Sequence, residues 1–107
     1  MTPKAMETKS TRRVMVRYTV KPERVEEHEA LIRAVFHELA EKAPAGIRYG
    51  AFKQPDGVSF VHVAFISAEK NPLDAIAAFK AFTARIRERC DDPPSTVELS
   101  EIGSFGF

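Results

Sequence analysis

Three side chains of this sequence stand out as candidates for chemistry: Arg17, Tyr49 and His62. The imidazole of His62 could polarise or deprotonate an acidic phenol, because histidine titrates near working pH. Arg17 could pair with an anionic substrate, and the Tyr49 hydroxyl could hold a ligand oxygen. Each also has a structural interpretation: a hydrogen-bonded interface histidine, a salt bridge from Arg17 to Glu98 or Glu101, and an ordinary strand tyrosine.

Three further side chains are interpreted as structural. Cys90 is the only cysteine and is expected at the C-terminus of a helix, where the helix dipole disfavours a thiolate. His28 and His37 are nine residues apart on one expected helix. They therefore face different sides of that helix, and both are expected at the surface. The sequence predicts no metal site.

The elements that must position these residues follow the order strand, helix, strand, strand, helix, strand. Strands are expected over 13–20, 47–53, 60–66 and 95–102, and helices over 22–42 and 72–90. This order gives a four-stranded antiparallel sheet with both helices on one face, which is a ferredoxin-like α+β sandwich. One domain is expected over 13–107, preceded by a flexible tail over 1–12.

Local signals mark the ends of these elements. Pro22 is suited to the first turn of a helix, and Asn71 is a candidate cap for the helix that Pro72 opens. The run QPDG at residues 54–57 is strong hairpin-turn chemistry. Alternating apolar residues predict that Val14, Val16, Tyr18 and Val20 face the helices, which leaves Met15, Arg17 and Thr19 on the open face of the sheet.

Hairpin parity relates the two middle strands. A loop of two or four residues places Tyr49 and His62 on the same face, together with Phe60, Ala64 and Ile66. The alternate residues, Phe52, Val61, Val63 and Phe65, are wholly apolar at the centre of the strands. They are therefore assigned to the helices, and the mixed set around Tyr49 and His62 is assigned to the open face.

An open, mostly apolar sheet face requires a partner or a ligand. The sequence therefore predicts a homodimer joined through the open faces, with apolar contacts from Met15, Phe60, Ala64 and Ile66. The same four residues are expected to bind a small hydrophobic ligand beside His62, Tyr49 and Arg17. The terminal segment 105–107 is expected to add to the contact with the partner.

Composition excludes several classes of function. The net charge of +1 gives no reason to expect a nucleic-acid partner. Residues 56–63 imitate the third strand of RNA-recognition domains, but they lack its stacking rings. No apolar run approaches the roughly 18 residues of a membrane helix, and the N-terminus lacks the apolar core of a secretory signal. A single cysteine fits a reducing cytoplasm.

From about residue 13 to 105, the chain resembles the antibiotic-biosynthesis-monooxygenase group of the dimeric α+β barrel superfamily. The resemblance rests on three segments: VMVRYTVKP at 14–22, which leads into an acidic helix, GIRY at 46–49, and PDGVSFV at 55–61. A helix and a closing strand follow. The resemblance implies two sheets packed face to face in a homodimer. It also implies a cofactor-independent monooxygenase acting on a small hydrophobic or aromatic compound.

The sequence departs from this family where chemistry is concentrated. Members often end the third strand with a Glu-x-Trp pattern and carry a histidine in the second helix. Here the strand reads HVAFI at 62–66, the helix reads AIAAFK at 75–80, and the chain contains no tryptophan. The alternative function is therefore a non-catalytic dimeric barrel that binds a small ligand or serves as an assembly unit.

Overall fold

A computed structural model describes residues 11–107 of the chain. Its elements, in chain order, are β1 (Arg12–Val20), the 3-10 helix η1 (Pro22–Arg24), α2 (Val25–Lys42), β2 (Ile47–Lys53), β3 (Ser59–Ile66), the 3-10 helix η2 (Pro72–Ala75), α3 (Ala77–Ala84), α4 (Ile86–Arg89) and β4 (Cys90–Glu98). The expected tail lies outside the described residues up to residue 10, and Arg12 already belongs to β1. No helix in the described part is long and apolar enough to cross a membrane.

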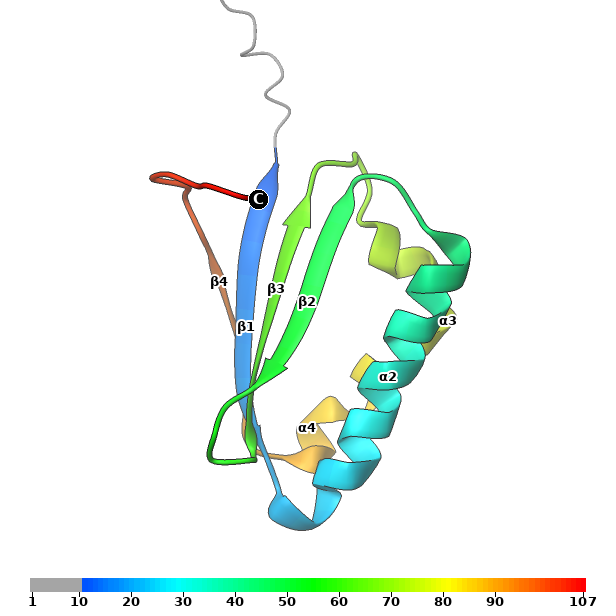
Figure 1. Cartoon of the computed structure of the whole chain (residues 1–107). Helices are drawn as coiled ribbons and strands as arrows, with labels where there is room; N and C mark the ends of the chain where they lie inside the picture. The colour runs from blue at the N-terminus through cyan, green and yellow to red at the C-terminus, as the bar shows by residue number, and fades with distance from the viewer. Residues whose placement is uncertain (1–10) are drawn as a thin grey trace, which may run out of the picture.

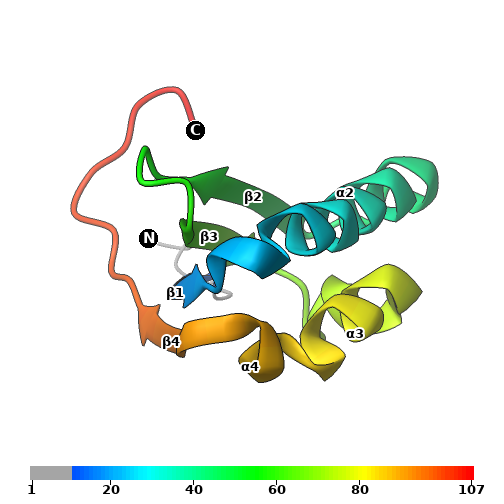
Figure 2. The same ribbon diagram turned by 90° about the horizontal axis from the view of Figure 1, so that it is seen from below.

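The strands form one antiparallel sheet in the order β2-β3-β1-β4, and all the helices cover one of its faces (Figures 1 and 2). The predicted ferredoxin-like α+β arrangement is confirmed. The main buried cluster lies between the sheet and the helices. Its members are Tyr18, Val20, Val35, Phe60, Leu73, Ile76, Phe82 and Cys90.

The β2–β3 hairpin forms as its turn residues predict. Asp56 Oδ1 accepts hydrogen bonds from the backbone N–H groups of Val58, at 3.0 Å, and Ser59, at 2.8 Å. Gly57 adopts a φ of 80°, in the left-handed region that favours glycine. The backbone N–H of Gln54 donates to the carbonyl of Ser59, so the loop has an even length and the predicted parity is confirmed.

The faces of this hairpin are opposite to the prediction. The β3 residues that share a sheet face with Tyr49 are buried beneath the helices: Phe60, His62, Ala64 and Ile66. The alternate set (Phe52, Val61, Val63 and Phe65) lies on the open face, where Phe52 is 60 % exposed. His62 tolerates burial because both of its ring nitrogens have hydrogen-bond partners. The β1 prediction is confirmed, since Val14 and Val16 pair with Ala64 and His62.

The second helical segment is broken where one helix was expected. Asn71 caps η2 as predicted, because its Oδ1 accepts a hydrogen bond from the Leu73 N–H at 3.0 Å. Ile76 then leaves the helical conformation, with φ −99° and ψ 109°, and buries its side chain in the core. Glu38 of α2 caps the new start by accepting from the backbone N–H groups of Ala77 and Ala78.

The last strand, β4, begins and ends earlier in the sequence than predicted. It begins at Cys90, five residues before Ser95, and ends at Glu98 rather than near Ile102. The run DDPP at 91–94 therefore lies inside an edge strand, where proline is tolerated because only one side of the strand is paired.

The C-terminal segment crosses the open face of the sheet. The ring of Phe107 lies 5.8 Å from that of Phe65, and the Arg48 guanidinium lies 5.6 Å from the Phe107 centroid. Ile102 and Phe105 are almost fully exposed. Within one chain, the open face is therefore partly covered by the chain's own last residue.

Candidate functional site

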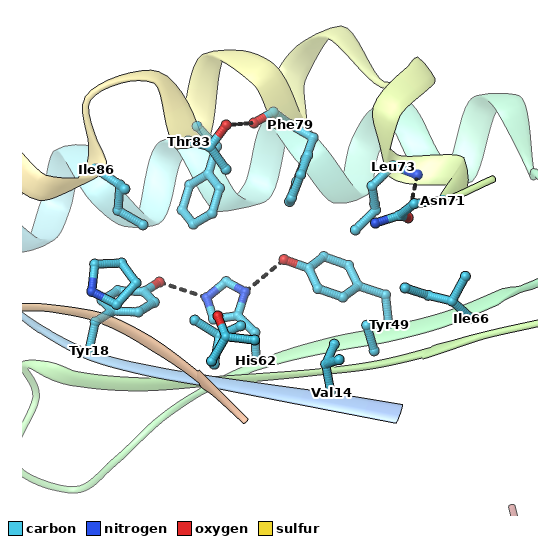
Figure 3. A pocket seen from close by; sticks show the side chains of 15 residues that line it. Val14, Tyr18, Tyr49, His62, Ile66, Asn71, Leu73, Phe79, Thr83 and Ile86 are labelled. Carbon is cyan, nitrogen blue, oxygen red and sulfur yellow. Dashed lines mark hydrogen bonds between the residues drawn. The ribbon is translucent and has the colours of Figure 1, made fainter. Parts of the chain in front are cut away.

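A pocket of about 270 Å³ lies between the helix-covered face of the sheet and the broken second helix. That volume is slightly below the roughly 300–1,000 Å³ typical of ligand pockets, which matches a small ligand. The sheet supplies its floor, and η2, α3 and α4 supply its roof (Figure 3). It is lined by Val14, Val16, Tyr18, Tyr49, His62, Ala64, Ile66, Asn71, Leu73, Phe79, Phe82, Thr83, Ile86, Pro94 and Thr96.

Side-chain hydrogen bonds connect Tyr49 at the pocket with the buried interior. The Tyr49 hydroxyl and His62 Nδ1 are 2.7 Å apart, and His62 Nε2 lies 2.6 Å from the Tyr18 hydroxyl (Figure 3). The Tyr18 hydroxyl also lies 2.6 Å from His28 Nε2. Arg89 Nε donates to His28 Nδ1 at 3.0 Å. We call these five side chains the hydrogen-bond chain.

Burial controls the charge state of this chain. Loss of solvent lowers the pKa of His62 to about 4, and burial together with the Arg89 cation lowers the pKa of His28 to about 4. Burial raises the pKa of Tyr49 and of Tyr18 well above the ordinary value. At neutral pH, both histidines are therefore uncharged and both tyrosines keep their protons.

The pocket brings together part of the site expected from the sequence. His62 and Tyr49 line it, together with Ala64 and Ile66. Phe60 does not line this pocket; it is a core residue whose ring stacks on Tyr18 at 5.6 Å. All five residues were expected on the open face and lie on the helix side, because the hairpin faces are reversed.

Arg17 and Met15 lie away from this pocket. On β1 they alternate with the residues of the floor, so they point to the open face. Arg17 also lacks the expected partners, since Glu98 pairs with Arg12 at 3.4 Å and Glu101 with Arg13 at 3.0 Å. Within one chain, Arg17 and His62 therefore lie on opposite faces of the sheet.

Of the hydrogen-bond chain, the sequence interpretation named only Tyr49 and His62 as site residues; Tyr18 was expected only as a residue that faces the helices, and His28 and Arg89 were missed. His28 was expected at the surface, but it is fully buried. Its position signals this, because it continues the apolar spacing of Val25, Leu31 and Val35 along α2. Arg89 had no such signal: it is buried because its guanidinium donates to His28 and to the carbonyl of Phe82.

The remaining candidates agree with their structural interpretation. Cys90 is buried, and burial raises the pKa of its thiol, so a thiolate is disfavoured. It begins β4 directly after α4. His37 is exposed on α2. Across residues 11–107, no group of three His, Cys, Asp or Glu side chains could hold a metal ion.

No protein-family model and no curated protein matches this chain. Solved structures do match its fold. Rv0793 from Mycobacterium tuberculosis superposes with a TM-score of 0.72 at 18% identity, covering 89% of this chain and 98% of that one. SnoaB, a cofactor-independent oxygenase from Streptomyces nogalater, gives a TM-score of 0.66 at 15% identity, covering 91% and 98%.

A third similar structure is that of an antibiotic biosynthesis monooxygenase. It gives a TM-score of 0.64 at 16% identity and covers 86% of this chain and 99% of its own. Identities this low establish the fold and leave the activity open. The chain therefore has the ferredoxin-like fold of the antibiotic-biosynthesis-monooxygenase-like proteins.

Proposed function

We propose that this protein is a cofactor-independent monooxygenase that oxidises a small hydrophobic, aromatic compound in the pocket above His62 and Tyr49. The observation that carries the proposal is the pocket itself: a mainly apolar cavity of about 270 Å³ whose few polar lining groups include Tyr49 and His62 of the sheet. The fold shared with the oxygenase SnoaB supports the type of reaction. With one cysteine in the chain, we place the protein in the cytoplasm.

The proposed reaction needs no added reductant. A ring-activated methylene carbon of the substrate loses its hydrogens and becomes a carbonyl. One atom of O₂ enters that carbonyl, and the other leaves as water with the two hydrogens. The substrate supplies all the electrons that reduce O₂. The protein has to hold the aromatic ring away from water and stabilise the oxygen anion of the activated substrate.

Replacing Tyr49 with Phe is expected to lower oxygen uptake with an oxidisable hydroxylated aromatic about 100-fold, the usual scale for losing one donor to an oxyanion. An oxygen electrode measures the rate. Lys80→Ala is the matched control, because Lys80 is exposed on α3 and does not line the pocket. If the wild type consumes no oxygen with any such compound, the monooxygenase proposal is rejected.

A second candidate is a non-catalytic protein that binds the same kind of ligand. One observation favours it: both ring nitrogens of His62 and of His28 already have hydrogen-bond partners, and the pKa of each histidine is about 4. Neither imidazole is a ready base. Reversible binding of an aromatic ligand without oxygen uptake selects this candidate.

We also propose that the protein is a homodimer that joins through the open sheet faces. Phe52, Val63 and Phe65 supply apolar surface there, and a second copy would remove it from water. Unlike Phe60, which belongs to the core, Val63 is a fair probe of that face.

Val63→Glu is expected to convert the dimer into a folded monomer at micromolar concentration, because an unpaired carboxylate would be buried in the contact. Analytical ultracentrifugation and circular dichroism measure the two properties. Val63→Thr retains the branched shape and should remain dimeric. A Val63→Glu protein that stays dimeric shows that this face is not the interface.

A further inference from the structure

Arg89 fixes the direction of the hydrogen-bond chain. A guanidinium has donors and no acceptor, so His28 Nδ1, 3.0 Å from Arg89 Nε, must accept. A neutral imidazole has one N–H group, and in His28 that group therefore lies on Nε2. Nε2 then donates to the Tyr18 hydroxyl at 2.6 Å.

The same logic continues to the pocket. The Tyr18 oxygen already accepts from His28, so its own O–H donates to His62 Nε2 at 2.6 Å. The proton of neutral His62 must then lie on Nδ1, which donates to the Tyr49 hydroxyl oxygen at 2.7 Å. Of the tyrosine and histidine hydrogens in the chain, only that of the Tyr49 hydroxyl has no acceptor among the described residues, and Tyr49 lines the pocket.

The opposite direction is blocked at the far end. If Tyr49 accepted from a ligand hydroxyl and donated to His62, every hydrogen along the chain would reverse. The His28 proton would then lie on Nδ1, directed at the Arg89 Nε–H 3.0 Å away. Two donors would then face each other in a buried site. This arrangement is unfavourable, and no hydrogen bond at that end of the chain compensates for it.

The charge of Arg89 acts in the same direction. Its side chain is buried, and none of the ion pairs among residues 11–107 includes it. A buried cation at one end of a chain of aligned donors polarises each hydrogen toward the other end. The Tyr49 end therefore favours a negatively charged or strongly accepting oxygen over a hydroxyl that must donate.

We propose that the pocket selects aromatic ligands that present a phenolate, enolate or carbonyl oxygen to the Tyr49 hydroxyl, and that Arg89 is the positioning residue that makes Tyr49 a donor. This ligand class rests on the proposed function, because it assigns the ligand to the same pocket. It also assigns Tyr49 the role of binding the substrate oxygen. A group that does not belong to the hydrogen-bond chain must then remove the substrate proton.

Nitrogen NMR of the imidazole rings tests the direction in the ligand-free, full-length protein. We expect the proton of His28 on Nε2 and that of His62 on Nδ1, with the signal of exposed His37 as internal reference. Opposite tautomers in the two buried rings support the one-way chain. A proton on Nε2 of His62 or on Nδ1 of His28 overturns it.

Binding of pentafluorophenolate and of its methyl ether, pentafluoroanisole, tests the ligand class. Fluorine NMR titration at neutral pH should show the wild type binding the phenolate at least 10-fold more tightly than the ether, since a hydrogen bond to an anion is a strong one. Tyr49→Phe should remove this preference and leave the affinity for the ether within about twofold. A preference that survives Tyr49→Phe overturns the assignment.

Two variants of Arg89 separate positioning from packing. Arg89→Met removes the charge and the donor, and should reduce the phenolate preference about 10-fold. Arg89→Lys keeps a cationic donor, so this variant should retain most of the wild-type preference for the phenolate. If neither probe binds the wild type, the pocket assignment fails, and the proposed function fails with it. Tight phenolate binding without oxygen uptake rejects the monooxygenase alone and leaves the ligand class standing.

Discussion

Lowering the pH from about 6.5 to about 4 is expected to destabilise this protein by several kcal/mol. The pKa values of His28 and His62 fall from 6.5 to about 4 on folding, so the unfolded chain binds more protons than the folded chain within this window. Stability is therefore fully present above about 6.5 and is lost as the pH falls toward 4. Each shift corresponds to roughly 3 kcal/mol.

The groups that face the two rings determine this window. Arg89 reinforces the effect of burial on His28, while the neighbouring Glu27 and Glu29 on α2 oppose it. His62 faces the hydroxyls of Tyr18 and Tyr49, which remain protonated throughout.

Urea unfolding followed by circular dichroism between pH 7.5 and 4 measures the effect. His37→Gln is the control, because His37 is exposed on α2 and is not part of the hydrogen-bond chain. Carboxylates give a separate signal at lower pH: the pKa of Glu38 is lowered to about 2 by Lys42 and by the backbone N–H groups of Ala78 and Ala77. Stability that stays constant from pH 6.5 to 4 contradicts the burial of two neutral histidines.

Tyr18→Phe should cost about 2–4 kcal/mol of the free energy of unfolding, because the missing hydroxyl leaves polar nitrogens of both His28 and His62 without a partner in the core. The stacking of the ring on Phe60 is kept, so the loss reports the hydroxyl alone. Chemical denaturation at pH 7.5 provides the measurement.

Tyr49→Phe is the matched control for this variant. The Tyr49 hydroxyl bonds to a single nitrogen, His62 Nδ1, and borders the pocket, where water can replace it. Its loss should cost about 1 kcal/mol. Equal losses in the two tyrosine variants would show that Tyr18 does not join the two histidines.

The element order was predictable because each helix and strand carries its own period and its own end signals. Pro22, the QPDG turn at 54–57 and Asn71 all act as local chemistry predicts. The break at Ile76 was not predictable from local signals. Its apolar spacing continues a helix, and only the burial of Ile76 and the cap from Glu38, thirty-nine residues before Ala77, favour interruption.

For the site, the sequence predicted which residues share a face of the sheet but not which face the helices cover. Hairpin parity placed Tyr49 and His62 on one face, but β3 is apolar on both faces, so polarity could not decide which face the helices cover. The residue type alone does not indicate that a strand histidine is deeply buried. Its burial depends on Tyr18, forty-four residues away along the chain, and pairing between such residues is set by strand register.

The interrupted second helix has a consequence for how the pocket is reached. α3 has eight residues and α4 has four, and both are shorter than the roughly 12–15 residues at which an isolated helix becomes even marginally stable in water. The roof therefore keeps its shape through side-chain packing, whereas the floor is secured by the ladders of β1 and β3. Thermal opening should lift α3 before it disturbs the sheet, so a ligand can enter through a brief local excursion while the floor retains its geometry.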